Sequence, residues 1–315
     1  MNDTTADHEQ GPRHLALVGC TASGKSAIAV ELARRLGDIE IVTVDSMQVY
    51  RGMDIGTAKP TPQERSEIPH HLIDIGDPSE DWNVTRWAAI ARRTVDEIER
   101  RGHRVLLVGG TGLYFQALVD GFSPPGRFPE IRKELEEDQD TSALHSRLRE
   151  LDPLAASRME PTNRRRVIRA LEVTIGSGRS FSSYGPGVAH FPSAPRWRIA
   201  GVWLPRPVLA RRIDERLDAM MQGGFLDEVR RLVAATVESG LSRTARQALG
   251  YRELLGHLQD GIPLEQAVDE AKRRTRAFAR RQRVWWRRDP RIAWFGAPDN
   301  PFAVTAALLG QWKSP

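Results

Sequence analysis

The feature that most constrains the fold is a short glycine-rich segment flanked by two different hydrophobic patterns. The run HLALVGC from His14 is apolar and ends at glycine, as a buried parallel strand does, and the segment from Lys25 to Leu36 has helical periodicity. Between them, Gly19–Ser26 reads GCTASGKS, which fits the G-x-x-x-x-G-K-[ST] pattern of a phosphate-binding loop, or P-loop. A strand, a tight loop and a helix in this order predict an α/β fold that binds phosphate groups.

Each residue type in this loop suits a phosphate ligand. The glycines let the backbone fold tightly, so that successive N–H groups point inward, and the helix that begins at Lys25 adds its positive N-terminal end. Lys25 would supply a mobile charge and Ser26 a hydroxyl ligand for Mg²⁺. The predicted phosphate-binding residues are Gly19, Cys20, Thr21, Ala22, Ser23, Gly24, Lys25 and Ser26. The loop identifies a class of ligand but not a reaction, because most such proteins bind ATP or GTP.

Alternating strand and helix patterns extend this architecture along the chain. A helical pattern from about Val84 to Arg101 is ended by Gly102. Apolar runs of strand length are Ile39 to Val44, Val105 to Val108, Trp197 to Leu204 and Ile292 to Phe295. Strands that alternate with helices of this length predict a parallel sheet covered on both faces. The predicted fold class is therefore α/β, with a sheet like that of P-loop NTPases and an inserted helical domain.

Changes in composition indicate where the domains divide. Residues 1–12 are polar and are predicted to be a disordered tail. The turn-forming segment GFSPPGRFP begins at Gly121, and a charged helical pattern follows from Glu130 to about Ile175. The predicted segments are an α/β core of 13–120 and 197–315 and a helical insertion domain of 121–196.

Composition narrows the class of protein further. Of the 315 residues, 40% are hydrophobic and 28% are charged, as in folded soluble proteins. No apolar run reaches the roughly 20 residues that span a bilayer. The single cysteine, Cys20, excludes an intramolecular disulfide framework and suits a reducing compartment. We expect a cytoplasmic protein without membrane association.

The arginines are unevenly distributed. The net charge is only +5, but arginines concentrate in two stretches, Arg164 to Arg169 and Lys272 to Arg291. Such clusters favour a polyanionic partner more strongly than the total charge does. From composition alone, a solvated helix face explains an arginine-rich helix equally well.

Two polar residues are predicted at the carboxyl ends of strands, where ligands gather in open α/β sheets. Asp45 follows the second strand and suits a Mg²⁺ ligand, a general base or a helix cap. Thr111, within GGTGLY, follows the next strand, and its hydroxyl would face the same crevice. The GGTG turn is weak evidence by itself, because such turns also simply connect a strand to a helix.

Several longer stretches resemble the tRNA dimethylallyltransferase family, also called tRNA isopentenyltransferases. Besides the P-loop, the matching stretches are VDSMQVYRGMDIGTAKP, PHHLID, LVGGTGLY, RRVIRALEV, RIDERLDAMMQGGFLDEV, ARQALGYRE and RRQRVWWRR. They occur in order up to residue 288, and the DSMQVYRGMDIGTAKP block is far more specific than the P-loop. One departure is Cys20, where the family usually has proline, and we expect it to have a small effect on the stiffness of the loop.

The resemblance implies transfer of a dimethylallyl group from its diphosphate to the exocyclic N6 amine of the adenine just 3′ of the tRNA anticodon. Diphosphate would be released, with Mg²⁺ as cofactor. Asp45 matches the family's general base, and Thr111 matches the residue that orients the amine. Arg216, in the RLDxM segment, matches a further diphosphate contact; a surface ion pair with Asp214 or Glu215 is its alternative. We expect a monomer.

The resemblance also implies a tRNA-binding surface, with the insertion domain at the anticodon loop. Arg165 stands where relatives often have glutamine, and Arg132 is a weaker candidate at the mouth of the site. The implied tRNA-binding residues are Asp45, Ser46, Met47, Gln48, Arg132, Arg165, Arg166, Val167, Ile168, Arg169, Gln247, Gly250, Tyr251, Arg252, Arg280 and Arg281. Trp285 and Trp286 are instead expected to pack in the core or between domains.

Three other interpretations stay open. A small-molecule P-loop kinase explains the loop but leaves the DSMQVYRGMDIGTAKP block and both arginine clusters without a purpose. An adenylate prenyltransferase has closer chemistry, although the long basic C-terminal segment disfavours it. A non-catalytic RNA-binding protein is disfavoured because Lys25, Ser26, Asp45 and Thr111 occur together. His70, His71 and Asp74 lack further ligands at zinc-like spacing, so we predict no dedicated metal site there.

Overall fold

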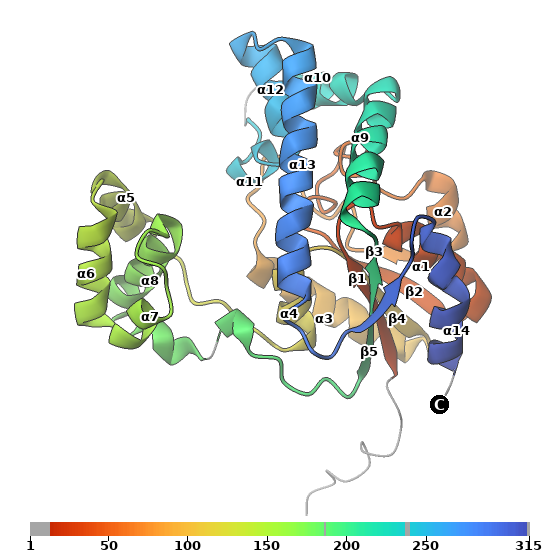
Figure 1. Ribbon diagram of the computed structural model, residues 1–315, viewed down its shortest axis with the longest axis horizontal. Helices are drawn as coiled ribbons and strands as arrows, with labels where there is room; N and C mark the ends of the chain where they lie inside the picture. The colour runs from red at the N-terminus through yellow and green to blue at the C-terminus, as the bar shows by residue number, and fades with distance from the viewer. Residues whose placement is uncertain (1–12, 186, 237–239, 314–315) are drawn as a thin grey trace, which may run out of the picture. The chain divides into compact units, whose positions relative to one another are not determined.

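The computed structural model describes residues 13–185, 187–236 and 240–313 (Figure 1). The tail predicted for residues 1–12 lies outside them. The chain forms two compact units, one made of the residues before Phe122 and after His190, and the other of Phe122–His190. The insertion expected from the sequence, 121–196, extends a few residues past the end of this second unit. Each unit is described by itself below.

The larger unit is built on a parallel sheet, as the sequence predicted, and the sheet has six strands, of which one, at His70–His71, was not predicted. Its strands are β1 (His14–Gly19), β2 (Ile39–Val44), β3 (His70–His71), β4 (Arg104–Gly109), β5 (Trp197–Trp203) and β6 (Ala293–Gly296). They lie in the order β3-β2-β4-β1-β5-β6. Gly109 at the end of β4 is in register with Val44 of β2 and with Val18 of β1. The segments after β1, β2 and β4 therefore emerge side by side at one edge of the sheet.

Both faces of the sheet are covered, because successive strand residues point to opposite sides. Leu15 and Leu17 of β1 pack on one side with α1 and α14, and Ala16 and Val18 pack on the other with α3 and α4. These helices are α1 (Lys25–Leu36), α3 (Val84–Arg100), α4 (Gly112–Val119) and α14 (Thr305–Lys313). Buried apolar runs in the strands thus serve two separate cores.

Further helices of the larger unit pack beyond the sheet edge from which the P-loop emerges. They are α2 (Pro62–Glu67), α9 (Arg206–Gln222), α10 (Phe225–Ala235), α11 (Arg243–Arg246), α12 (Tyr251–Asp260) and α13 (Leu264–Trp286). The long α13 packs along α9 and α12 (Figure 1). Trp286 is fully buried edge-to-face against Phe115, and Trp285 packs partly buried on the same core, so the predicted packing role of both is confirmed. None of the helices in the described part of the chain combines the length and apolar character needed to cross a membrane.

The smaller unit is a helical bundle with its own core. Its helices are α5 (Pro129–Glu137), α6 (Thr141–Leu151), α7 (Pro153–Ser157) and α8 (Arg164–Ser177), followed by the short 3₁₀ turns η1 (Phe181–Tyr184) and η2 (Gly187–Ala189). Asp140 and Asn163 cap the N-termini of α6 and α8 through their side-chain oxygens. Leu148, Val167 and Leu171 are fully buried where α6 and α8 meet.

A buried carboxylate holds the loop after β2 in place. The Oε2 atom of Glu228 on α10 accepts hydrogen bonds from the backbone N–H of Asp54 and Ile55 at 3.0 and 2.7 Å, and Oε1 accepts from that of Gly56 at 3.2 Å. The hydroxyl of Tyr251 also donates to Oε1, at 2.5 Å. Burial and the charge of Glu228 together raise the pKa of Tyr251, so that it stays a donor. Glu228 therefore accepts four hydrogen bonds, three from the loop and one from Tyr251 of α12, and these hold the loop against α10 and α12.

We predict that Glu228→Gln lowers the free energy of unfolding by about 2–4 kcal/mol, because an amide turns an N–H group toward donors that need an acceptor. Urea denaturation measures the change. Asp227→Asn is the matched control: Asp227 is exposed and, among the residues that the structure describes, forms an ion pair only with Arg230, so its loss should change stability by less than about 0.5 kcal/mol. Equal effects of the two substitutions would contradict the role given to Glu228.

Candidate active site

The loop after β1 has the backbone that its glycines predicted. Gly24 has a φ of 84°, and Ala22 also has a positive φ, 62°, which is uncommon for a residue with a side chain. A Cβ on Gly24 would lie 2.5 Å from Pro301, so only glycine fits there. The N–H of Ser23 closes a turn onto the carbonyl of Cys20 at 3.2 Å, and α1 begins at Lys25. The loop thus presents a helix N-terminus to its cavity.

Cys20, at the family's usual proline position, is a buried part of this loop. Its Sγ donates a hydrogen bond to the carbonyl of Ala279 on α13 at 3.4 Å. Burial raises the pKa of the Cys20 thiol, opposed in part by Lys25 and Arg283. The thiol is therefore a neutral donor that attaches the loop to α13.

Three cationic side chains, Lys25, Arg212 and Arg216, line one cavity of about 300 Å³ beside the loop, together with Lys59, which pairs with Asp54 and Asp74. Burial and the charge of Arg216 lower the pKa of Lys25 to about 8. Burial also lowers the pKa of Arg216, although Asp45 opposes this. The alternative of a surface ion pair for Arg216 is not realised, since Asp214 pairs with Arg276 and Glu215 with Arg211. Among the described residues, none of the three cations has a carboxylate within ion-pair distance.

Arg212 was not found by the sequence analysis, although a signal for it exists. It lies one turn before Arg216 on α9, so the i, i+4 spacing in RRIDER places both guanidinium groups on one face. Its Nε donates to the carbonyl of Ala22 in the P-loop at 3.0 Å. Arg212 thus contacts the P-loop and lines the same cavity as Lys25.

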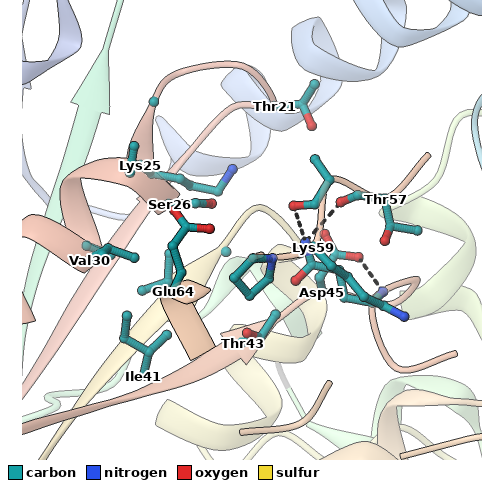
Figure 2. Close-up of a pocket in the computed structure, with 18 of the residues that line it drawn as sticks. Thr21, Lys25, Ser26, Val30, Ile41, Thr43, Asp45, Thr57, Lys59 and Glu64 are labelled. Carbon is teal, nitrogen blue, oxygen red and sulfur yellow. Dashed lines mark hydrogen bonds between the residues drawn. The ribbon is translucent and has the colours of Figure 1, made fainter. Parts of the chain in front are cut away.

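Asp45 stands across the cavity from the P-loop. Figure 2 shows Lys25 and Ser26 on one side and Asp45, Thr57 and Lys59 on the other. The Oδ1 atom of Asp45 accepts from the backbone N–H of Met47 at 2.8 Å and of Gln48 at 3.3 Å, which fixes the carboxylate in a turn. Its Oδ2 has no hydrogen-bond partner within the part of the chain that the structure describes. One carboxylate oxygen therefore positions the group and the other is available for chemistry.

Thr111 lies next to Asp45 through the sheet, although it is not part of the cavity lining. Its backbone N–H donates to the carbonyl of Val44 at 3.4 Å, one residue before Asp45. Thr111 precedes α4, and its side chain makes no capping bond. The parallel register of β2 and β4 thus brings the two predicted catalytic residues together.

The loop from Ser46 to Pro60 closes the cavity and is held by its own side chains. Gln48 donates from Nε2 to the carbonyls of Thr57 and Ala58 at 2.9 and 3.2 Å. Lys59, with a side chain only 1% exposed, donates to Asp54 at 2.7 Å and also to the carbonyl of Tyr50 and to Asp74. The amide of Gln48, predicted to bind tRNA, is therefore already engaged with the loop. Lys59 is a structural residue that the sequence analysis did not single out.

His70, His71 and Asp74, which were considered above as metal ligands, bind other protein groups. His71 pairs with buried Glu40 at 2.6 Å, and His70 contacts the carbonyl of Ile68 at 2.7 Å through Nδ1. Asp74 binds Lys59 and Arg65. Within the described ranges no group of three or more His, Cys, Asp or Glu side chains is arranged to hold a metal ion.

In the larger unit, the residues predicted to bind tRNA differ in accessibility. Gln247, Arg252, Arg280 and Arg281 are exposed, and Ser46 and Met47 are partly so. Tyr251 is 1% exposed and hydrogen-bonded to Glu228. The sequence analysis predicted that it contacts tRNA, but its side chain is packed in the core. Gly250 is also buried; a Cβ there would lie 2.7 Å from Phe225. Gly250 and Tyr251 are thus packing residues at the start of α12.

In the second basic stretch, Lys272 to Arg291, some arginines are paired or buried and others are exposed. Several of them are paired with acidic side chains: Arg273 with Glu270, Arg274 with Glu253, Arg276 with Asp214, and Arg291 with Asp120 and Asp289. Arg283 is buried over the ring of Trp203 at 3.6 Å. The exposed pair Arg280 and Arg281 makes no ion pair with any residue the structure describes. Only part of this stretch is therefore available to a polyanion.

In the smaller unit, the predicted tRNA-binding residues lie on α5 and α8. Arg165 and Arg166 are exposed, whereas Val167 and Ile168 are buried in the core, so their side chains pack and do not contact RNA as predicted. Arg169 and Arg132 converge on Glu172, which is 1% exposed, at 2.7 and 3.4 Å. The helical period sorts this motif into an outward basic face and an inward apolar one.

Comparison with known proteins identifies the family. A family model described as IPP transferase matches residues 48–289, and one described as isopentenyl transferase matches residues 13–77. The tRNA dimethylallyltransferase of Moorella thermoacetica is 47% identical over 304 residues, covering 93% of each chain. That of Geobacter metallireducens is 42% identical and covers 96% of this chain and 98% of its own.

Solved structures agree with these relatives. The tRNA isopentenylpyrophosphate transferase of Bacillus halodurans gives a TM-score of 0.67 at 38% identity, over 95% of this chain and 96% of that one. A eukaryotic dimethylallyltransferase acting on tRNA gives a TM-score of 0.76 at 27% identity, over 95% of this chain and 77% of that one. The P-loop NTPase-like parallel sheet is common to this group, as the sequence predicted. The chain belongs to the tRNA dimethylallyltransferase, or IPP transferase, family.

Proposed function

We propose that this protein transfers a dimethylallyl group from dimethylallyl diphosphate to the N6 amine of the adenine just 3′ of the tRNA anticodon, releasing diphosphate. The observation that carries the proposal is one cavity with two unlike sides. Lys25, Arg212 and Arg216 line it without an ion-pair partner among the described residues, and Asp45 stands across the cavity from Lys25 (Figure 2). Such a cavity suits a polyanionic leaving group and a proton acceptor at the same time.

The cationic side suits the diphosphate. Buried cations without counter-ions are unfavourable until an anion neutralises them. The positive N-terminal end of α1, the ammonium of Lys25 and the two guanidinium groups would surround a group of high negative charge. As the bond between carbon and diphosphate oxygen breaks, further negative charge develops on that oxygen, and preorganised donors stabilise it.

Asp45 supports the other half of the reaction. The N6 lone pair forms a bond to C1 of the dimethylallyl group, while the C1–O bond breaks and diphosphate leaves with that electron pair. The surplus proton on N6 passes to Oδ2 of Asp45, whose Oδ1 is held by two backbone N–H groups. Thr111, beside Asp45, would orient the amine through its hydroxyl. The adenine would leave its stack in the anticodon loop to reach these groups.

The residues present also fit a role for Mg²⁺. Ser26 lines the same cavity as Lys25 and offers a hydroxyl oxygen. Mg²⁺ commonly takes one or two protein oxygens and completes its shell with phosphate oxygens and water, so a larger acidic cluster is not required. When bound, the ion would neutralise part of the charge on the leaving diphosphate.

The tRNA would be held by the exposed polar and basic residues on both units, namely Arg165, Arg166, Gln247, Arg252, Arg280 and Arg281. Arginine binds phosphates through its planar fork and stacks on unstacked bases. We further propose that the protein acts as a monomer in the cytoplasm, where tRNA is its partner.

A transfer assay tests the function. Purified protein, Mg²⁺ and radiolabelled dimethylallyl diphosphate are incubated with unmodified tRNA, and in parallel with AMP. We expect label at the adenine adjacent to the anticodon, and at least about a hundredfold lower kcat for Asp45→Asn because the proton acceptor is removed. Label in AMP alone would make the protein an adenylate prenyltransferase, and absence of transfer to either acceptor would overturn the proposal. Wild-type turnover of Asp45→Asn would exclude Asp45 as the base.

The titration of Lys25 predicts the pH dependence of donor use. Its pKa of about 8 means that the free protein carries the ammonium below that pH and loses it above. We expect kcat/KM for dimethylallyl diphosphate to fall as pH rises through about 8, since kcat/KM reports groups of the free enzyme. Arg216→Gln removes a repelling charge, so the break should move to higher pH even as donor affinity falls. If kcat/KM falls at the same pH in Arg216→Gln as in the wild type, the charge of Arg216 does not set the pKa of Lys25.

The exposed arginines of α8 predict the salt dependence of tRNA binding. Replacing Arg165 and Arg166 with glutamine should weaken binding and reduce the slope of log K against log salt by about 1–2, because each lost phosphate contact removes roughly 0.7–0.9. Binding is measured by filter retention between low and moderate salt. Arg230→Gln is the control, since it removes an exposed arginine paired with Asp227 on the larger unit. An unchanged slope for the double variant would place the RNA elsewhere.

A further inference from the structure

The C-terminal half of α13 has two unlike faces. Arg280, Arg281 and Val284 are exposed, whereas Ala279 and Gln282 are buried. Gln282 is only 6% exposed, although it is a polar residue in the middle of a basic segment. A buried amide has to find partners for both its oxygen and its nitrogen. Its partners therefore indicate why a polar side chain stands there.

The amide of Gln282 joins the two loops of the candidate active site. Its Oε1 accepts a hydrogen bond from the backbone N–H of Thr21 in the P-loop at 2.8 Å. Its Nε2 donates to the carbonyl of Gly110, the residue before Thr111, at 3.0 Å. The orientation of the amide is set by these partners, because an N–H needs an acceptor and a carbonyl needs a donor. One side chain thus connects the loop after β1 with the loop after β4.

The glycines of the GGTG turn make this contact possible. A Cβ on Gly110 would lie 2.3 Å from Nε2 of Gln282 and 3.3 Å from the carbonyl oxygen of Gly19. A Cβ on Gly112 would lie 1.9 Å from Nε1 of Trp285. The helix therefore lies directly against the turn on both sides of Thr111. Larger residues at either glycine would separate α13 from it.

The P-loop is held to α13 at a second point as well. The thiol of Cys20 donates to the carbonyl of Ala279, one turn before Gln282. Because the N–H of Thr21 already has a protein acceptor, this amide is used to place the loop and not to bind phosphate.

We propose that Gln282 is a positioning residue that fixes the distance between the P-loop and the loop carrying Thr111. This inference rests on the proposed function: the P-loop holds the diphosphate of the donor, and Thr111 orients the amine of the acceptor. The separation of the two loops then sets the separation of the attacking nitrogen and C1. Misplacement of reacting groups by about 1 Å costs on the order of a hundredfold in rate.

Glutamine meets both requirements at this position, and its nearest chemical relatives do not. Glutamate offers two acceptors and no donor when ionised, methionine has a similar volume with neither, and asparagine is one methylene shorter. Gln282→Met therefore removes both connections at nearly constant volume. Gln266→Met makes the same chemical change at an exposed position near the start of α13 and is the matched control.

The test is steady-state and product-inhibition kinetics of the full-length variants. For Gln282→Met we expect kcat for tRNA prenylation to fall about ten- to a hundredfold. The inhibition constant of inorganic diphosphate should stay within about threefold of wild type, because the phosphate-binding amides remain. Gln266→Met should match the wild type. If Gln282→Met does not fold, Gly110→Ala displaces the same amide from the other side and should give the same loss of kcat. A folded variant of either kind with wild-type kcat would overturn the proposal.

A double-mutant cycle with Thr111→Ala separates positioning from a general structural effect. If Gln282 acts through the loop of Thr111, Gln282→Met should reduce kcat much less in the Thr111→Ala protein than in the wild type. Two losses that simply multiply would overturn the proposal. Wild-type kcat for Thr111→Ala alone would instead refute the role given to Thr111 in the proposed function, and absence of prenyl transfer by the unaltered protein would refute that function itself.

Discussion

The structure depends on gathering positive charge in one cavity where the cations Lys25, Arg212 and Arg216 form no ion pair with any described residue, although Asp45 lies in the same cavity. Besides burial, the charge of Arg216 lowers the pKa of Lys25, and the charge of Arg212, from the same face of α9, lowers the pKa of Arg216. Such an arrangement is unfavourable in the absence of an anion, so the rest of the fold has to hold it together. The parallel sheet does part of this, because its register delivers the P-loop, Asp45 and the turn of Thr111 to one edge.

The remaining support comes from buried polar side chains, each with several partners. Glu228 takes four donors and fixes the loop after β2 to α10 and α12, and Lys59 ties the same loop to itself. Gln282 joins the P-loop to the GGTG turn through one hydrogen bond to each. Buried polar groups with all partners satisfied specify one geometry, because moving any partner leaves an unpaired group away from water. The long block after Asp45 is therefore explained by support of the cavity as well as by lining it.

The sequence predicted those parts of the fold that depend on local pattern. The strands and the flanking helices were found from uninterrupted apolar runs and helical spacing, whereas β3, with only His70 and His71, carries no such pattern. Lys25, Ser26 and Asp45 were brought to one cavity as expected, because a parallel sheet aligns the segments that leave its strands. Gln282 and Glu228 were missed because their roles depend on partners far away in the chain. Val167, Ile168 and Tyr251 were assigned to tRNA by resemblance, yet helical spacing places Val167 and Ile168 on the buried face of their helix.

The arginines show why composition alone could not assign the RNA surface. Arg164 and Arg165 are adjacent, but Arg164 donates to the carbonyls of Glu136 and Asp138 at the end of α5, whereas Arg165 is exposed. Along α13 the paired arginines lie toward α9 and α12, and Arg280 and Arg281 come after them, toward the P-loop. An arginine already bonded to a carboxylate has to lose that bond before it can bind a phosphate, so it contributes less to affinity and to its salt dependence. The exposed Arg280 and Arg281 are thus on the same segment of α13 that contacts the P-loop and the GGTG turn through Gln282.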